Sequence, residues 1–195
     1  LLRNRDHRVV FLTTAFFTIP LAAFYPYTPP NLKELGLVHT TAWMSLGQIT
    51  EVIAMLALGT LLLRWRLKWI LACGLTLGMV RYALAAMGTQ WGVVAGVVLH
   101  GASFTLVIIT AQIYLDQRVD PAWRARGQAL MALMNSGLGS VIGYLGTGSW
   151  FAACTTNERT HWTLFWGGLS AASAVVLLFF LALYQGRGRR EGTLS

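Results

Sequence analysis

Six long apolar stretches follow one another along the chain, and short polar segments separate them. Each is close to or above the roughly 20 residues that a helix needs to cross a hydrocarbon core about 30 Å thick. None alternates apolar and polar residues as barrel strands do, so helices are favoured. We predict an all-α membrane protein with six transmembrane helices, over residues 9–27, 41–63, 69–87, 93–115, 129–152 and 164–184.

The first apolar stretch contains several prolines near its end. Pro20 and Pro26 each remove a backbone donor and are expected to kink the helix, and Pro29 and Pro30 are expected to end it. Broken helices that carry aromatic residues are typical of transporter substrate paths, which makes Tyr25 a candidate for a cavity wall. The alternative is a helix that simply unwinds at the membrane surface, where tyrosines are common.

Pairs of glycines four residues apart occur in three of the later stretches, at 74 and 78, 92 and 96, and 139 and 143. Glycine at this spacing lets two helices approach closely within a membrane. We interpret the pairs as packing positions. A second interpretation stays open for the glycine-rich stretch 129–152, which would bend or slide during a transport cycle.

Composition and charge agree with a membrane protein. The chain is 55% hydrophobic and 11% charged, whereas a soluble domain carries about 25% charged residues. The net charge of +8 would suit nucleic acid, but the basic residues lie in short segments between the apolar stretches, as topology signals do. We therefore predict no nucleic-acid partner.

The distribution of lysine and arginine also predicts the orientation. If the chain crosses six times, twelve of the 15 basic residues lie on one side. They are Arg3, Arg5, Arg8, Arg64, Arg66, Lys68, Arg118, Arg124, Arg126, Arg187, Arg189 and Arg190. The positive-inside rule then places both ends in the cytoplasm. We predict a plasma membrane location, in a bacterium the inner membrane. Because the chain starts with Leu1 in a basic segment, we also expect it to be a piece of a longer protein.

A polar pair interrupts the second apolar stretch. Gln48 and Glu51 are three residues apart and so share one helix face. An ionisable group inside a span costs roughly 3 kcal/mol, so it usually has a function. Glu51 would accept hydrogen bonds from a polar solute or couple transport to protons. The alternative is a structural carboxyl group locked to Arg81 or to the backbone.

Two further ionisable residues lie within the spans. Arg81 is interpreted as a structural charge that snorkels outward or reaches a neighbouring helix. His100 either relays protons or forms a hydrogen bond between helices. Phe104 lies on the face of His100 and either stacks on a planar ligand or packs in the core.

The motifs of hydrolases and nucleotide-driven enzymes, such as GxSxG, HExxH, the P-loop and CxxC, do not occur in the sequence. Cys73 and Cys154 are far apart and lack metal-ligand spacing. We therefore predict a protein that is not an enzyme and has no metal site and no cofactor. A carrier driven by an ion gradient is the simplest interpretation.

Five motifs in fixed order resemble a known family. They are SLGQITE at 45–51, RWRLKW at 64–69, RYAL at 81–84, LHGASF at 99–104, and VDP with RARGQ at 119–128. Together they are similar to the C-terminal half of the nucleoside:proton symporter family of the major facilitator superfamily. The resemblance covers all six stretches. It implies a fold of two six-helix halves, with the N-terminal half preceding Leu1.

The resemblance also implies roles for individual residues. Gln48 and Glu51 match the polar pair that contacts the nucleoside, and Phe104 matches an aromatic residue beside the base. His100 stands where the pattern has tyrosine, and Thr105 stands where some members carry an acid. Tyr25 falls where some members have an amide side chain.

The predicted function is proton-coupled uptake of a nucleoside by alternating access across the lipid bilayer. The predicted solute-binding residues are Gln48, Glu51, Tyr25, Phe104, His100 and Thr105, with Glu51 the candidate for proton coupling. The alternatives are a carrier for a sugar or another small polar metabolite, a six-span structural subunit, and a membrane-embedded enzyme.

Overall fold

The computed structural model describes residues 4–186, and these fold into six helical spans. Each span is long and apolar enough to cross a membrane, which confirms the predicted all-α membrane fold. The spans are Arg5–Glu34, Thr40–Arg64, Leu67–Ala85, Gln90–Arg118, Pro121–Ala153 and Trp162–Leu183.

Three spans are single helices, and three are built from consecutive segments. The single helices are α3 (Thr40–Arg64), α4 (Leu67–Ala85) and α9 (Trp162–Leu183). The first span joins α1 (Arg5–Leu21) and α2 (Phe24–Glu34), and the fourth joins α5 (Gln90–Phe104), η1 (Thr105–Ile109) and α6 (Thr110–Arg118). The fifth joins η2 (Pro121–Trp123), α7 (Arg124–Ala132), η3 (Leu133–Gly139) and α8 (Ser140–Ala153).

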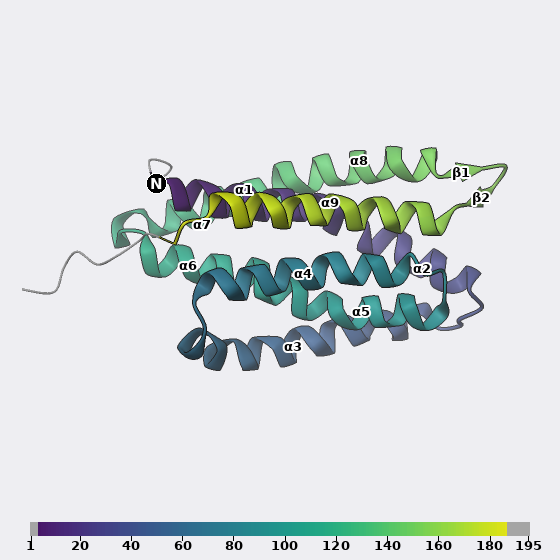
Figure 1. Ribbon diagram of the computed structural model, residues 1–195, viewed down its shortest axis with the longest axis horizontal. Coiled ribbons are helices and arrows are strands. Elements are labelled where there is room, and N and C mark those ends of the chain that lie inside the picture. The colour runs from purple at the N-terminus through teal and green to yellow at the C-terminus, as the bar shows by residue number, and fades with distance from the viewer. Residues whose placement is uncertain (1–3, 187–195) are drawn as a thin grey trace, which may run out of the picture.

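The helices form two groups that lie side by side along the long axis of the bundle (Figure 1). In one group, α3 and α4 both pack on α5, and in the other, α1 packs on α8 and α9. The packing of α4 on α9 joins the groups. α3 is the most exposed span. Only 11% of the most apolar stretch of this helix is buried, against 67% for the span that contains α5.

The first span breaks between α1 and α2, where prolines were expected to kink it. A proline ring clashes with the carbonyl group four residues earlier, and for Pro26 that is the carbonyl of Ala22. The helical pattern is interrupted at Ala22 and Ala23. The expectation that Pro29 and Pro30 end the helix is wrong, because α2 continues to Glu34.

Tertiary contacts explain why α2 tolerates its prolines. Its inner face is buried through Phe24, Thr28, Asn31 and Leu32. Asn31 also accepts a 2.9 Å hydrogen bond from the indole of Trp166 on α9. These contacts stabilise a helix that its own backbone hydrogen bonds would support poorly.

Glycines lie where helices approach most closely, as their spacing predicted. A Cβ atom at Gly143 would lie 2.7 Å from the Cβ atom of Ala22, and one at Gly78 would lie 2.7 Å from the ring of Phe17. Gly101 on α5 is still tighter, since a Cβ atom there would lie 2.1 Å from the carbonyl oxygen of Gly47. α3 and α5 are therefore in backbone contact at this level of the bundle.

The structure contains local features that the apolar pattern did not predict. The fifth span begins at Pro121 rather than near residue 129, because the Asp120 side chain caps a turn by accepting from the Ala122 N–H at 2.9 Å. The segments η1 and η3 are π-helical. Strands β1 (Thr155–Thr156) and β2 (Arg159–Thr160) pair as an antiparallel hairpin between α8 and α9.

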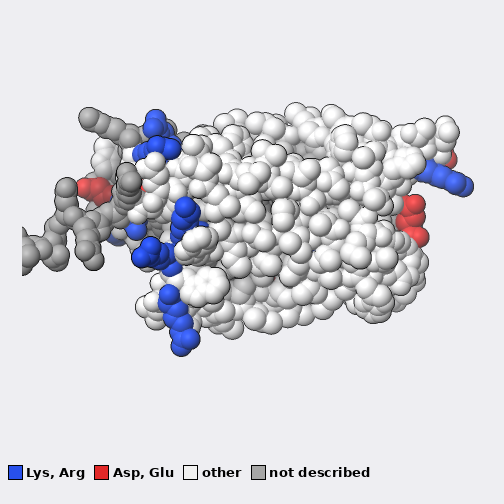
Figure 2. Space-filling view, in the orientation of Figure 1, with Lys and Arg blue, Asp and Glu red and all other residues white. Residues whose placement is uncertain are grey.

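Basic side chains gather at the end of the bundle opposite this hairpin (Figure 2). Among residues 4–186 the basic residues of the predicted inner side are Arg5, Arg8, Arg64, Arg66, Lys68, Arg118, Arg124 and Arg126. Arg3, Arg187, Arg189 and Arg190 lie outside the described residues. The absolute orientation in the membrane stays a prediction.

The six-span fold predicts that the α3–α4 turn and the β1–β2 hairpin lie on opposite membrane faces. In a background without Cys73 and Cys154, Arg66→Cys and Glu158→Cys are expected to react with a membrane-impermeant maleimide from opposite sides of sealed vesicles. Reaction of both cysteines from the same side would contradict the arrangement of the spans.

Candidate functional site

Four aromatic rings meet where the first span breaks. His100 of α5 is buried, with 4% of its surface exposed. Its ring stacks on Phe24, with centroids 3.5 Å apart and planes 6° apart. Tyr25 meets the imidazole edge-on at 5.9 Å, and Phe104 lies 6.4 Å away on the next turn of α5. The structure therefore brings together three of the predicted site residues, Tyr25, His100 and Phe104. It also adds Phe24, which was not predicted.

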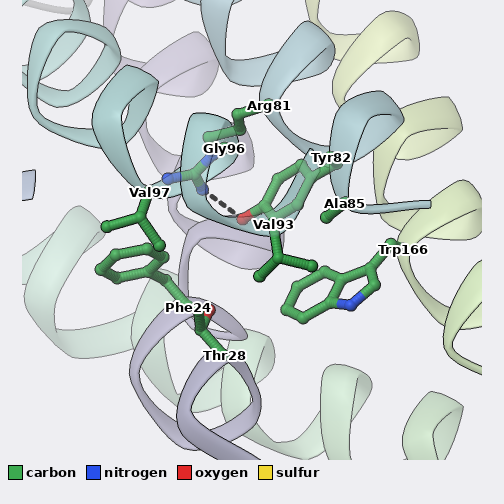
Figure 3. A pocket seen from close by; sticks show the side chains of 9 residues that line it. All are labelled: Phe24, Thr28, Arg81, Tyr82, Ala85, Val93, Gly96, Val97 and Trp166. Atoms are coloured by element: carbon green, nitrogen blue, oxygen red, sulfur yellow. Dashed lines mark hydrogen bonds between the residues drawn. The ribbon is translucent and has the colours of Figure 1, made fainter. Parts of the chain in front are cut away.

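A buried cation lies directly beside this cluster. Arg81 of α4 is only 2% exposed, and its guanidinium group contacts His100 Nδ1 and the hydroxyl of Tyr82. The guanidinium carbon also lies 5.5 Å from the centre of the Phe24 ring (Figure 3). Because arginine has only donors, His100 Nδ1 accepts, which requires a neutral imidazole with its proton on Nε2.

This contact decides between the interpretations of Arg81. Its side chain reaches a neighbouring helix instead of snorkelling to the surface. Within residues 4–186, its hydrogen-bond partners are His100 and Tyr82 rather than a carboxylate, and its Nε atom has no partner. Glu51 is therefore not locked to Arg81.

Tyr82 connects the cation to the broken helix. Its hydroxyl donates to the carbonyl oxygen of Pro20 at 2.5 Å, and its ring stacks on Trp166 at 5.8 Å. A pocket lined by Phe24, Arg81, Tyr82 and Trp166 adjoins these contacts (Figure 3). Its volume of about 10 Å³ leaves room for about one water molecule. This part of the structure is therefore a connection between helices and not a cavity for a solute of nucleoside size.

The predicted polar pair lies on the exposed helix α3, which packs on α5 as α4 does. Gln48 is exposed and Glu51 is half-buried. Neither the amide of Gln48 nor the carboxyl group of Glu51 forms a hydrogen bond with another residue in the described range 4–186. The adjacent Ile49 and Val52 are 53% and 55% exposed. Polar groups within a span face protein or a water-filled cavity rather than lipid, so this part of α3 is suited to binding a solute.

The close seam between α3 and α5 places this polar pair near the rings. A Cβ atom at Gly47, next to Gln48, would lie 3.6 Å from the imidazole of His100. The hydroxyl of Thr50 donates to the Val98 carbonyl oxygen at 2.7 Å. The hydroxyl of Thr105 donates to the Glu51 carbonyl oxygen at 3.3 Å.

The site residues differ in how accessible they are. Tyr25 is 56% exposed, and Phe104 is half-buried. Thr105 is fully buried, and its hydroxyl is occupied by the backbone of Glu51. Phe24 and Tyr82 were not predicted as site residues, because no spacing separates either of them from the other aromatic residues of the core.

The bundle and its seam of polar and aromatic groups define a class of protein. It is an all-α membrane bundle of six spans, with a first span broken beside a buried charge and, at mid-span, a polar pair that has no hydrogen-bond partner among the described residues. The structure of the nucleoside transporter NupG matches this fold with a TM-score of 0.84 at 23% identity. The match covers 94% of this chain and 49% of that chain.

Comparisons of the sequence identify the family. The family described as "Nucleoside H+ symporter" matches residues 1–188. YegT of Escherichia coli (strain K12), named as a candidate nucleoside transporter, is 32% identical over 193 residues, covering 95% of this chain and 45% of YegT. The nucleoside permease NupG of the same organism is 27% identical, covering 75% of this chain and 36% of NupG.

The chain belongs to the nucleoside H+ symporter family, which confirms the resemblance found in its motifs. Members of this family are transporters and not enzymes. The chain spans less than half of the length of the curated relatives it matches.

The link through Tyr82 predicts a loss of stability when its hydroxyl is removed. Tyr82→Phe leaves a buried N–H of Arg81 without its partner, and an unsatisfied buried donor costs about 1–3 kcal/mol. We expect a lower midpoint of thermal unfolding in detergent. Tyr144→Phe is the matched control, because Tyr144 is 54% exposed. Equal midpoints for the two variants would show that the link contributes little.

Proposed function

We propose that this chain is the C-terminal six-helix half of a carrier that takes up a nucleoside together with protons by alternating access. Membership of the family supports the cargo and the coupling ion. The match to about half of the NupG structure supports an N-terminal six-helix half as the partner within the same protein. The predicted sugar carrier and structural subunit have no comparable support.

The observation that carries the proposal is the free hydrogen-bonding capacity of Gln48 and Glu51. Both lie on a largely apolar helix, and neither has a hydrogen-bond partner in the part of the chain that the structure describes. A nucleoside carries hydroxyl groups on its sugar and donors and acceptors on the edge of its base. An amide and a carboxyl group about one helical turn apart would satisfy both kinds of group.

In this proposal the aromatic residues bind the base. Tyr25 and Phe104 both lie close to the imidazole of His100, with ring centroids 5.9 and 6.4 Å from it, and provide two ring surfaces. Stacking of a planar base on such rings contributes about 0.5–1.5 kcal/mol each beyond burial. His100 would contact the solute with its Nε2–H, since its Nδ1 is committed to Arg81. Thr105 would act through the backbone of Glu51, to which it donates.

We assign proton coupling to Glu51. It is the one acidic residue inside the apolar part of the spans described, and its carboxyl group has no ion-pair partner there. Burial disfavours the charged form of a carboxyl group. Its protonation would therefore change when the site opens to the other side of the membrane. Such a group exchanges protons with each side in turn.

The proposed location is the plasma membrane, in a bacterium the inner membrane, with both ends of the chain in the cytoplasm. The basic end of the bundle supports this orientation, since lysine and arginine accumulate in cytoplasmic loops (Figure 2).

The role of Glu51 predicts the effect of Glu51→Gln in the full-length protein. The amide keeps the shape and most hydrogen bonds but cannot exchange a proton, so uphill uptake driven by a proton gradient is expected to fall at least tenfold. Exchange of labelled for unlabelled nucleoside at equal concentrations needs no proton gradient and is expected to persist. Both are measured in proteoliposomes.

Glu158→Gln is the matched control, because Glu158 lies at the turn of the hairpin, outside the spans. It is expected to leave both activities unchanged. Normal uphill uptake by the Glu51→Gln variant across pH would place the coupling site elsewhere.

The two ring surfaces predict the cargo. Uridine and adenosine are expected to compete for uptake, and simple hexoses are not. Phe104→Ala is expected to weaken nucleoside binding by roughly 1 kcal/mol, the scale of one aromatic contact. Competition measurements on both forms test this.

Phe179→Ala serves as the control for loss of a ring, because Phe179 packs on Phe16 between α1 and α9 and is not among the rings that contact His100. Competition by hexoses alone would reject a nucleoside cargo and favour a sugar.

A further inference from the structure

A second open groove lies at the basic end of the bundle, away from the proposed solute site. It is formed where α3 turns into α4 and where the end of α9 packs beside them. Its volume is about 740 Å³, within the range of roughly 300–1,000 Å³ that is usual for small-molecule sites. The lining residues are Arg64, Trp65, Arg66, Trp69, Ala72, Cys73, Thr76, Leu177 and Leu181.

The mouth of the groove is positively charged. Arg64 and Arg66 are exposed, and the lining contains no acidic residue. In the described range of the chain, neither guanidinium group has a hydrogen bond or an ion pair with protein. Two arginines with free donors, two residues apart, are suited to binding a phosphate group, which arginine contacts with two parallel hydrogen bonds.

The remainder of the groove is amphipathic and then apolar. Trp65 and Trp69 are 51% and 57% exposed, and tryptophan concentrates at the headgroup level of membranes. Behind them lie Cys73 on α4 and Leu177 and Leu181 on α9. The order from the end of the spans inward is thus cation, indole and aliphatic surface. A phospholipid presents phosphate, glycerol ester and acyl chain in the same order.

We infer that this groove binds one anionic phospholipid, with its headgroup phosphate on Arg64 and Arg66 and one acyl chain along α4 and α9. The groove opens at the ends of membrane spans, where headgroups lie, and basic pockets between helices at this level bind anionic lipids. A free phosphate ion would use the arginines but not the apolar surface. The inference goes beyond the proposed transport function and does not depend on it.

The test uses the full-length protein, purified in a neutral detergent and titrated with dioleoyl phosphatidylglycerol, dioleoyl phosphatidylcholine or inorganic phosphate. Native mass spectrometry measures the bound lipid. Phosphatidylglycerol is expected to bind at least tenfold more tightly than phosphatidylcholine, and millimolar inorganic phosphate is expected not to displace it. Equal binding of the two lipids would overturn the inference. Displacement by phosphate would show a site for the free ion instead.

Variants locate the lipid. Arg64→Gln with Arg66→Gln is expected to weaken phosphatidylglycerol binding by roughly tenfold or more, because both cations that would hold the headgroup phosphate are lost. Arg124→Gln with Arg126→Gln removes the same charge at the same end of the bundle but outside the groove, and is expected to have little effect. Equal losses in the two double variants would indicate a diffuse charge effect and overturn the assigned site.

A second measurement does not depend on the folding of the arginine variants. Phosphatidylglycerol with brominated acyl chains quenches nearby tryptophans, and Trp65 and Trp69 are expected to account for most of the quenching. The double variant Trp65→Phe, Trp69→Phe is expected to lose more than half of it. Unchanged quenching would place the acyl chain outside the groove.

Discussion

The structure depends on a positive charge buried inside a membrane-spanning bundle. A charged arginine inside a membrane span is costly, so its donors must find partners within the protein. Arg81 finds them on two elements, at His100 of α5 and at the hydroxyl of its neighbour Tyr82. Tyr82 in turn holds the carbonyl oxygen of Pro20, at the end of α1. The need to solvate one guanidinium group thus ties three spans together beside the break in the first.

This arrangement has consequences for the proposed solute site. His100 is held on one side by Arg81 and on one face by Phe24, so its ring has a fixed position and a fixed tautomer. Tyr25 and Phe104 lie against that fixed ring, and α3 meets the same part of α5 in backbone contact at Gly101. A rigid base formed by the buried charge therefore supports a more exposed layer of polar and aromatic groups. Rigid support of this kind is what keeps binding groups in a productive geometry.

The two proposed binding sites both contain polar side chains without a protein partner, but at different depths in the membrane. In the proposed solute site the free groups are Gln48 and Glu51, which lie in the middle of a span and would require a cavity or the proposed N-terminal half around them. In the groove the free groups are Arg64 and Arg66, which lie at the end of a span and can meet headgroups directly. The depth of a polar group along the bundle therefore determines whether it is suited to binding a solute or a lipid headgroup.

Much of the fold was predictable from the sequence, because apolar length alone determines whether a helix can span a membrane. The six spans, the break near Pro26 and the close approach at the glycine pairs were all expected. The end of α2 was not, since its position past Pro29 and Pro30 depends on the buried inner face of the helix, which includes the hydrogen bond from Trp166 to Asn31. The π-helical segments and the short hairpin were also missed, because they depend on local backbone geometry that hydropathy does not record.

For the site, the sequence by itself determined which polar residues lie inside the spans, since any such residue stands out in an apolar helix. It could not determine their partners. Whether Arg81 would meet Glu51, the surface or a neighbouring helix depended on how α4 is rotated against α5, and only the tertiary structure decided that it meets His100. Phe24 and Tyr82 became recognisable only through that contact, because the role of an aromatic residue in a core is set by what packs against it and not by its position in the chain.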